Sequence, residues 1–286
     1  MKRFVAVLAV LAVLYVLFFN PFGFSWLPFG HPQTDETVTG DVQSIKIETS
    51  GAEVQVVPEN GNRLWTKLDG GGSASVQKNG NTINVKMKGT DWFLPFSWFR
   101  HPDLTVYIPQ DYRRNLDLTV GSGTLSFDGK SANDPYVLEQ VILNVRSGTA
   151  DLRDFSARSL KLEEASGLAT LSTLSINSAA IHVQSGILNL KHYSGPVSAD
   201  VQSGNLNAQF AELKGPVTVD VQSGLATIDL PDNADFTLNG KIASGFIDCR
   251  LPLKNEQSDS TELKGTHGSG KYTVNLSVRS GLINLR

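Results

Sequence analysis

The residues of this chain that could do chemistry are five histidines, one cysteine and several serines and aspartates that recur in a pattern. The histidines lack the spacing of a zinc site, and His182 alternates with apolar residues, which predicts an outward-facing, solvated imidazole on a strand. We therefore expect no metal site and no cofactor. The histidines are His31, His101, His182, His192 and His267.

Cys249 is the only cysteine, so no disulfide can form within the chain. It occupies an apolar position of the repeat described below. This position favours a buried, small apolar side chain over a reactive thiol.

The serines belong to a Ser-Gly dipeptide that recurs along the chain. Equivalent nucleophiles in eight copies make no mechanistic sense, and the Gly-x-Ser-x-Gly motif is absent around them. We expect their hydroxyls to bond to nearby backbone at turns, and we predict no catalytic residues. The repeat corners are Ser122, Gly123, Ser147, Gly148, Ser166, Gly167, Ser185, Gly186, Ser203, Gly204, Ser223, Gly224, Ser244, Gly245, Ser280 and Gly281.

Four aspartates, Asp151, Asp200, Asp220 and Asp248, lie at outward-facing positions beside these corners. They could form an acidic row with weak affinity for cations, although a solvated face is the favoured interpretation. A glycan-cleaving β-helix needs Asp, Lys and Arg clustered on one wall, and here Lys and Arg do not recur in register. A glycan-active enzyme is therefore the least favoured function.

The elements that position these residues follow from the frame around each corner. Apolar residues fall two and four positions before each Ser and three and five after it, with Glu164 and Gly240 as exceptions. Such alternation predicts a half-buried strand on each side of the dipeptide. The last apolar residue before the dipeptide and the first one after it are five positions apart, which is an odd number. The chain must therefore turn or bulge there to keep both strands facing one core, and glycine could supply a positive φ at that point.

Two architectures fit this frame. Each Ser-Gly could be the loop of an antiparallel hairpin, which would pair Val183 with Leu188, or the corner of one coil of a parallel β-solenoid. The stretches from Gly195 to Gly204 and from Gly215 to Gly224 repeat a second corner, Gly-Pro, in step with the first. Stacked coils of equal length require such a recurrence. We therefore predict an all-β protein, a parallel β-solenoid of roughly 20-residue repeats.

The N-terminus predicts export. Met1-Lys2-Arg3 precedes an uncharged apolar run from Phe4 to Phe19. A cleaved signal and an uncleaved transmembrane helix both fit, and the missing small-residue cleavage site favours the anchor. We expect 1–29 to be the membrane anchor and juxtamembrane segment, with the C-terminal domain outside the cytoplasmic membrane of a bacterium. The net charge of -3 with no basic stripe predicts no nucleic-acid partner.

Residues 30–115 form a less regular β region that we expect to cap the regular Ser-Gly repeats of 116–286. Strand-like runs stand at 45–47, 54–57, 83–87 and 104–108. The aromatic loop between Gly89 and Pro102 would need a partner: the first coils, the juxtamembrane stretch, the bilayer surface or another protein. A hydrophobic cap on the first coils is the favoured interpretation. Its possible docking residues are Trp92, Phe93, Phe96, Trp98 and Phe99.

The chain finishes directly after the last repeat, at Leu285-Arg286. That final coil could be an open sheet edge that pairs with another molecule. Alternatively, a loop from Lys254 to Gly270 could fold back and cover it.

The Val-Gln-Ser-Gly copies at 183–186, 201–204 and 221–224, behind an N-terminal anchor, resemble the bacterial putative adhesin family that includes the LiaG-like proteins. The resemblance covers roughly residues 40 to 286 and supplies no catalytic residues. It implies a β-solenoid outside the cytoplasmic membrane. We expect a non-enzymatic binding or scaffolding module for cell-wall polymer or an envelope protein. The alternative is an accessory protein of a cell-envelope stress response that contacts a membrane partner.

Overall fold

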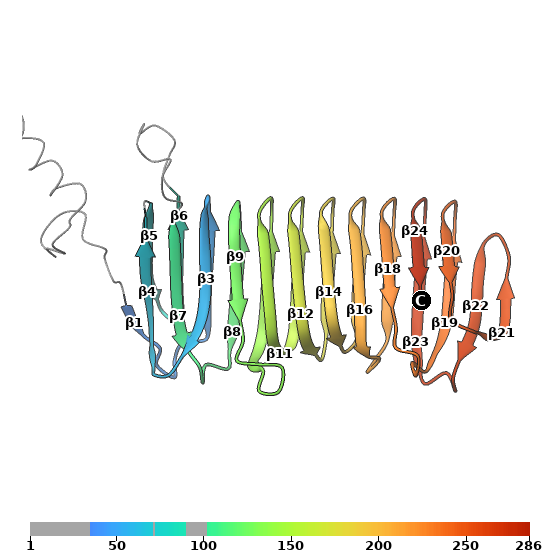
Figure 1. Ribbon diagram of the computed structural model, residues 1–286, viewed down its shortest axis with the longest axis horizontal. Coiled ribbons are helices and arrows are strands. Elements are labelled where there is room, and N and C mark those ends of the chain that lie inside the picture. Colours follow the sequence, from blue (N-terminus) through green and yellow to red (C-terminus); the bar gives the residue numbers. More distant parts are fainter. Residues whose placement is uncertain (1–34, 71, 90–101) are drawn as a thin grey trace, which may run out of the picture.

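The computed structural model describes residues 35–70, 72–89 and 102–286, which form an elongated stack of β-strands with no helix among them (Figure 1). Nothing in these ranges is both helical and apolar over a length that would cross a membrane. The predicted anchor at 1–29 and the aromatic loop with Trp92 and Trp98 lie outside the described residues. Both stay predictions.

The chain winds in coils, each with one strand before a corner and one after it. We call the strands that precede the corners the leading wall. In chain order it comprises β2 (Ser44–Ser50), β6 (Thr82–Lys88), β8 (Asn115–Val120), β10 (Tyr136–Val145), the second half of β11 (Thr149–Glu164), β13 (Ala179–Val183), β15 (Val197–Val201), β17 (Val217–Val221), β19 (Phe236–Ile242) and β23 (Tyr272–Val278).

The strands that follow the corners form the trailing wall. It comprises β3 (Ala52–Glu59), β7 (Asp103–Pro109), β9 (Gly123–Asp128), the first half of β11, β12 (Leu168–Ile176), β14 (Ile187–Ser194), β16 (Asn205–Glu212), β18 (Leu225–Asp229), β20 (Phe246–Cys249) and β24 (Leu282–Leu285). Antiparallel strands stand at the two ends: β1 (Asp35–Thr37), β4 (Arg63–Asp69) and β5 (Ser73–Asn79), then β21 (Lys254–Ser258) and β22 (Glu262–His267).

The strand pairing confirms the solenoid and excludes the hairpins. Val183 pairs in parallel with Glu164 on one side and Val201 on the other, and Leu188 pairs with Ala169 and Leu206. The two strands of one coil therefore do not pair with each other, and each pairs with its counterpart in the neighbouring coils. The strand-like runs expected before residue 115 are β2, β3, β6 and β7.

The core lies between the two walls and is filled by the alternating apolar residues. Its largest fully buried side chains include Phe127, Phe155, Tyr136 and Tyr193. The hydroxyl groups of both buried tyrosines form hydrogen bonds. Tyr136 donates to the Pro109 carbonyl at 2.6 Å, and Tyr193 donates to the Pro196 carbonyl at 2.7 Å. Burial raises the pKa of both phenols well above the usual range. Each ring thus fills core volume and ties one strand to a connecting segment.

The corner glycines are required for a different reason from the one predicted. Among the Ser-Gly corners, φ is positive only at Gly51 and Gly123. At Gly204, a Cβ atom would lie 2.6 Å from the Gly186 carbonyl oxygen and 2.7 Å from Val183 Cγ1 in the preceding coil. The other regular corners repeat this close contact with a neighbouring coil. Close stacking of one corner on the next therefore excludes a side chain, whatever the backbone conformation.

The second corner also stacks. Val197 N donates to the Pro216 carbonyl at 3.1 Å, and Gly215 packs on the Pro196 ring, which a Cβ would approach to 2.9 Å. The Gly-Pro pairs therefore lie one above the other, as coils of equal length require.

At the N-terminal end the first coil in sequence is not the outermost coil in space. The β2–β3 coil, with Ser50-Gly51 at its corner, lies between the β6–β7 coil and the β8–β9 coil. Strands β5 and β4 then pair antiparallel with β6 and β7, and β1 pairs with β4. Both walls are therefore capped at this end by strands that run against the stack.

At the C-terminal end, too, the last coil in sequence is not the outermost coil in space, so the expectation of a final coil at the end of the stack is wrong. The β23–β24 coil lies between the β17–β18 coil and the β19–β20 coil, so the chain terminus is inside the row (Figure 1). The loop expected to fold back contains β21 and β22, and β22 covers β19 antiparallel. Strand β20 pairs only with β24 among the described strands, so its outer edge is open.

Candidate binding surface

The corner serines form an exposed line along one edge of the stack, and their predicted bonds to backbone are found at only one of them. Ser122 Oγ accepts a hydrogen bond from Gly51 N at 2.9 Å. The hydroxyls of the other corner serines have no hydrogen-bond partner within the described residues. These hydroxyls are therefore available to solvent or to a ligand.

The outer face of the leading wall is charged. Three residues before the corners, Glu163, His182, Asp200 and Asp220 stand side by side on consecutive strands. His182 Nδ1 lies 3.7 Å from Asp200 Oδ2, with both side chains partly exposed. A hydrogen bond from Lys161 lowers the pKa of Glu163, so this carboxylate is ionised at neutral pH. The prediction of an outward-facing His182 is confirmed.

The four aspartates that could have formed an acidic row do not lie in one row. Asp200 and Asp220 are neighbours on the leading wall, whereas Asp151 and Asp248 lie on the trailing wall, on β11 and β20. Asp151 and Asp248 are separated by the strands between β11 and β20, and each lies near an arginine that follows it in the chain. No group of three His, Cys, Asp or Glu side chains in the described ranges could hold a metal ion.

The outer face of the trailing wall has a different character, which we call the neutral face. It spans β12, β14, β16, β18 and β24 and consists of two rows that start beside the corner serines. The row nearer the corners contains Leu168, Ile187, Asn205, Leu225 and Leu282. The next row contains Thr170, Asn189, Asn207, Thr227 and Asn284.

The neutral face is regular, and all of its side chains are at least partly exposed to solvent. Asn207 Nδ2 donates to Asn189 Oδ1 at 2.9 Å, so amides of adjacent coils align along the stack. Ile187 is 41% exposed and Leu282 is 36% exposed, because both side chains lie on the outer face of the wall. On β20 the first row continues with Phe246, which is 74% exposed. The sequence signal for these rows is the recurrence of uncharged residues two and four positions after each corner serine from Ser166 to Ser223 and at Ser280.

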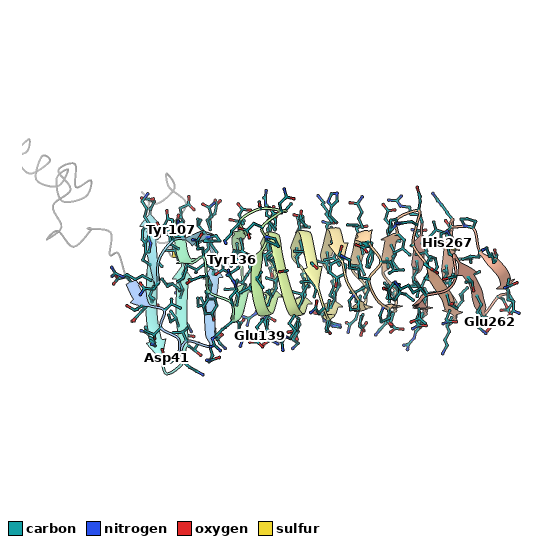
Figure 2. All side chains as sticks on the ribbon, turned by 90° about the horizontal axis from the view of Figure 1, so that it is seen from below. Asp41, Tyr107, Tyr136, Glu139, Glu262 and His267 are labelled. Atoms are coloured by element: carbon teal, nitrogen blue, oxygen red, sulfur yellow. The ribbon has the colours of Figure 1, made fainter. Side chains whose placement is uncertain are left out.

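Two shallow cavities lie away from the neutral face. The one at the N-terminal end has a volume of about 430 Å³ and is lined by Asp35, Glu59 and Trp65 among others. Trp65 stacks on Tyr107 with ring centroids 3.8 Å apart, and Figure 2 labels Tyr107 at this end of the stack. The second cavity, of about 480 Å³, is lined in part by Glu139, also labelled in Figure 2. Sequence patterns missed the Trp65–Tyr107 pair because it depends on the antiparallel pairing of β4 with β7.

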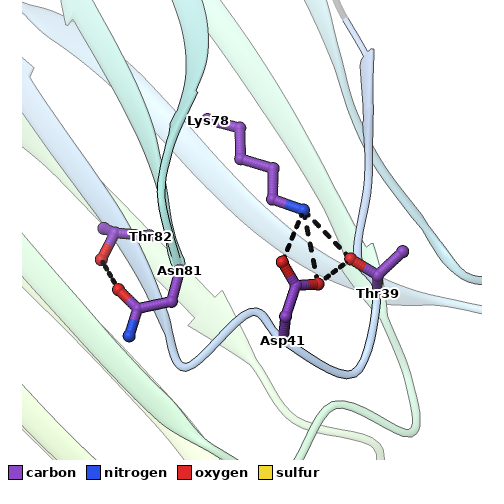
Figure 3. A network of polar contacts seen from close by, with 5 residues as sticks. All are labelled: Thr39, Asp41, Lys78, Asn81 and Thr82. Atoms are coloured by element: carbon purple, nitrogen blue, oxygen red, sulfur yellow. Dashed lines mark hydrogen bonds and ion pairs between the residues drawn. The ribbon is translucent and has the colours of Figure 1, made fainter.

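A polar cluster fixes the turn between β1 and β2 (Figure 3). Lys78 Nζ lies 3.0 Å from Thr39 Oγ1 and 3.2 Å from Asp41 Oδ2. Hydrogen bonds from Thr39, and then from Lys78, hold the pKa of Asp41 below its ordinary value. The cluster joins this turn to β5, the strand that caps the leading wall. Because Asp41 is 61% exposed, its ion pair with Lys78 contributes little to stability.

Cys249 lies on β20 against the edge of the core and is only partly buried, so the expected burial is found in part. Burial raises the pKa of its thiol. The thiol is therefore largely protonated at neutral pH, as the prediction of an unreactive side chain requires.

The sequence of this chain matches the family described as Toastrack DUF4097 over residues 42–286. The chain belongs to this family. The Toastrack match begins at Val42, directly before β2, and thus takes in both walls of the solenoid and both nested ends. No curated protein matches the chain in sequence.

Three solved structures are similar to this Toastrack chain at low sequence identity. A "putative adhesin" from Bacteroides fragilis has 11% identity and a TM-score of 0.48, with 90% of this chain and 97% of that one covered. A "putative adhesin" from Parabacteroides distasonis has 10% identity and a TM-score of 0.43, with 89% and 97% covered. A "putative cell adhesion protein" from Clostridium sporogenes has 10% identity and a TM-score of 0.26, with 89% and 98% covered.

Proposed function

We propose that this chain is a membrane-tethered, extracytoplasmic binding module of the bacterial cell envelope. The observation that carries the proposal is the repetition of outer-face residues in register from coil to coil. Such a surface offers many equivalent weak contacts to a partner that is itself repetitive, and these contacts add up through multivalency. A wall polymer is a partner of this kind.

The tether rests on the predicted anchor at 1–29 and not on the solenoid. A basic start followed by an apolar run orients the chain with Lys2 and Arg3 in the cytoplasm. The described strands would then project from the outer surface of the cytoplasmic membrane. A LiaG-like, non-catalytic role is part of the same proposal.

The test is sedimentation of the full-length protein, in detergent micelles, with purified cell wall from a bacterium that expresses it. We expect the protein to pellet with the wall and to remain in solution without it. A parallel capture from cross-linked membranes tests the accessory role in an envelope stress response. The adhesion function would be replaced by the accessory role under two conditions. The wild type would not bind cell wall, and it would capture a membrane protein that the Trp92→Ala/Trp98→Ala variant does not capture.

A further inference from the structure

The neutral face differs from its counterpart on the leading wall in carrying no charged residue in its two rows. Along the stack the two rows are bounded by Asp151 on β11 and by Asp248 on β20. Across the strands, Lys191 on β14 and Asp229 on β18 border the second row at the next outward positions. At about 4.8 Å per parallel strand, the face extends for about 19 Å along the stack. It therefore presents a flat strip of aliphatic, hydroxyl and amide groups to solvent.

This composition argues against two classes of ligand. Anionic polymers and nucleic acids are held by Lys and Arg, which the two rows lack. Protein interfaces are centred on Trp, Tyr or Arg anchors in pockets, and the rows contain none of these residues. Neither of the two cavities described above is lined by a residue of the rows.

The same composition matches an uncharged polysaccharide. A sugar ring offers an apolar face of C–H groups and a rim of hydroxyls, and a polysaccharide repeats both at regular intervals. The first row offers apolar contact through Leu168, Ile187, Leu225 and Leu282, with Asn205 as a polar interruption on β16. The Thr and Asn row can donate and accept hydrogen bonds. The exposed Phe246 ring at the end of the aliphatic row provides a surface on which a sugar ring can stack.

We infer that the neutral face binds an uncharged polysaccharide that lies along the solenoid axis, across the strands. The inference rests on the proposed function and specifies its ligand class and its surface. The corner serines border the same strip and add hydroxyls along one edge. Each coil makes a small contribution, and affinity grows with the number of sugar units that are engaged.

The experiment measures retention of the full-length protein, in detergent micelles, on three neutral matrices: chitin, cellulose and amylose. Heparin beads serve as the anionic comparison. We expect retention on at least one neutral matrix and none on heparin at moderate salt. The double variant Asn205→Asp/Asn207→Asp should lower retention at least tenfold, because it places two charges in the middle of the strip without changing side-chain size.

The matched control is Ser198→Asp/Thr218→Asp, which adds the same charge to the outer face of the leading wall on β15 and β17. We expect it to bind like the wild type. Phe246→Ser removes an exposed ring and leaves the core intact, so the variant should fold like the wild type. We expect it to lose retention severalfold, and this loss would not be explained by unfolding.

The outcomes separate the inference from the proposed function. Wall sedimentation without retention on any neutral matrix, or equal retention of both double variants, would overturn the inference and leave the binding module in place. Stronger binding to heparin than to the neutral matrices would overturn the assignment of an uncharged ligand. A wild type that is dimeric by analytical ultracentrifugation and becomes monomeric on Asn205→Asp/Asn207→Asp would show that a second copy covers this face instead. Absence of wall sedimentation would remove the proposed function itself.

Discussion

Replacing Glu164 with valine should stabilise the protein, because Glu164 is a carboxylate in the core. It occupies the position two residues before a corner serine that Val145 and Val183 fill in the neighbouring coils. The residue is 1% exposed, and neither carboxylate oxygen has a hydrogen-bond partner that satisfies normal geometry. Burial raises the pKa of Glu164, and the nearby amides of Gly167 and Gly186 offset only part of that cost.

The magnitude follows from these contacts. An unsatisfied buried polar group costs about 1–3 kcal/mol, and more when it is charged. Valine adds apolar contact with the corner of the next coil, where the carboxylate now lies against Gly186. We therefore expect Glu164→Val to raise the free energy of unfolding by about 2–4 kcal/mol at pH 7. Glu164→Gln should give a smaller increase, because it removes the charge and leaves a buried amide.

The pH dependence of this gain has a definite sign. The folded-state pKa of Glu164 lies above its ordinary value of 4.5, so the folded protein holds the proton more tightly than the unfolded chain. The destabilisation is therefore present above the folded pKa and absent below the unfolded one. Urea denaturation of wild type and Glu164→Val should show the largest difference near neutral pH, and this difference should shrink as the pH falls through the folded pKa of Glu164 toward 4.5.

The control is Glu163→Gln, which removes a neighbouring charge that is exposed and paired with Lys161 at 2.7 Å. We expect it to change stability by less than about 0.5 kcal/mol. If Glu164→Val lowers stability, or if its effect is the same at all pH values, then the carboxylate supports the corner and the argument from burial is wrong.

Three further predictions concern the stack and its C-terminal cap. Gly204→Ala should destabilise the protein by about 1–3 kcal/mol in urea denaturation. The control Gly40→Ala should be nearly neutral, because no atom lies within 4 Å of the new Cβ. Equal effects of the two substitutions would contradict the stacking argument. Deletion of residues 272–286 should leave β19–β22 open to proteolysis while β8–β16 stay protected, and a protease-resistant β22 would show that the cap does not need the last coil. Asp235 accepts hydrogen bonds from Ser269 and from the amides of 269–271, which lower its pKa to about 2. An NMR titration should show this turn ordered above pH 3.8 and loosened as the pH falls through about 2, and Asp235→Asn should loosen it at all pH values.

Much of the fold could be predicted from the sequence because the repeat fixes it locally. Apolar alternation around Val183 and Ile181 is a property of each strand, and the recurrence of two corners distinguishes coils from hairpins. The order of the coils could not be predicted in this way. Nothing in the apolar frame of β23 and β24 distinguishes a coil at the end of the stack from one inserted before β19, since both positions bury the same faces.

The candidate surface was missed for a related reason. The apolar frame consists of inward positions, so Leu168 and Ile187 are unremarkable outward residues within any single repeat. Only the coil-to-coil register brings these residues into one row with Leu225 and Leu282. The role of the corner glycines was misjudged because steric contact with the preceding coil, as at Gly204, is invisible in a single repeat.

The nesting of both ends limits how the length of this solenoid can change. A repeat array normally grows or shrinks when units are duplicated or lost at either terminus. Here the terminal coils, β2–β3 and β23–β24, are each held between two others, and the outermost coils carry the capping strands. Coil number can therefore vary only through duplication or loss between β8 and β18. Homologous proteins of different length should accordingly share both end assemblies and differ in the middle of the stack, where the neutral face lies.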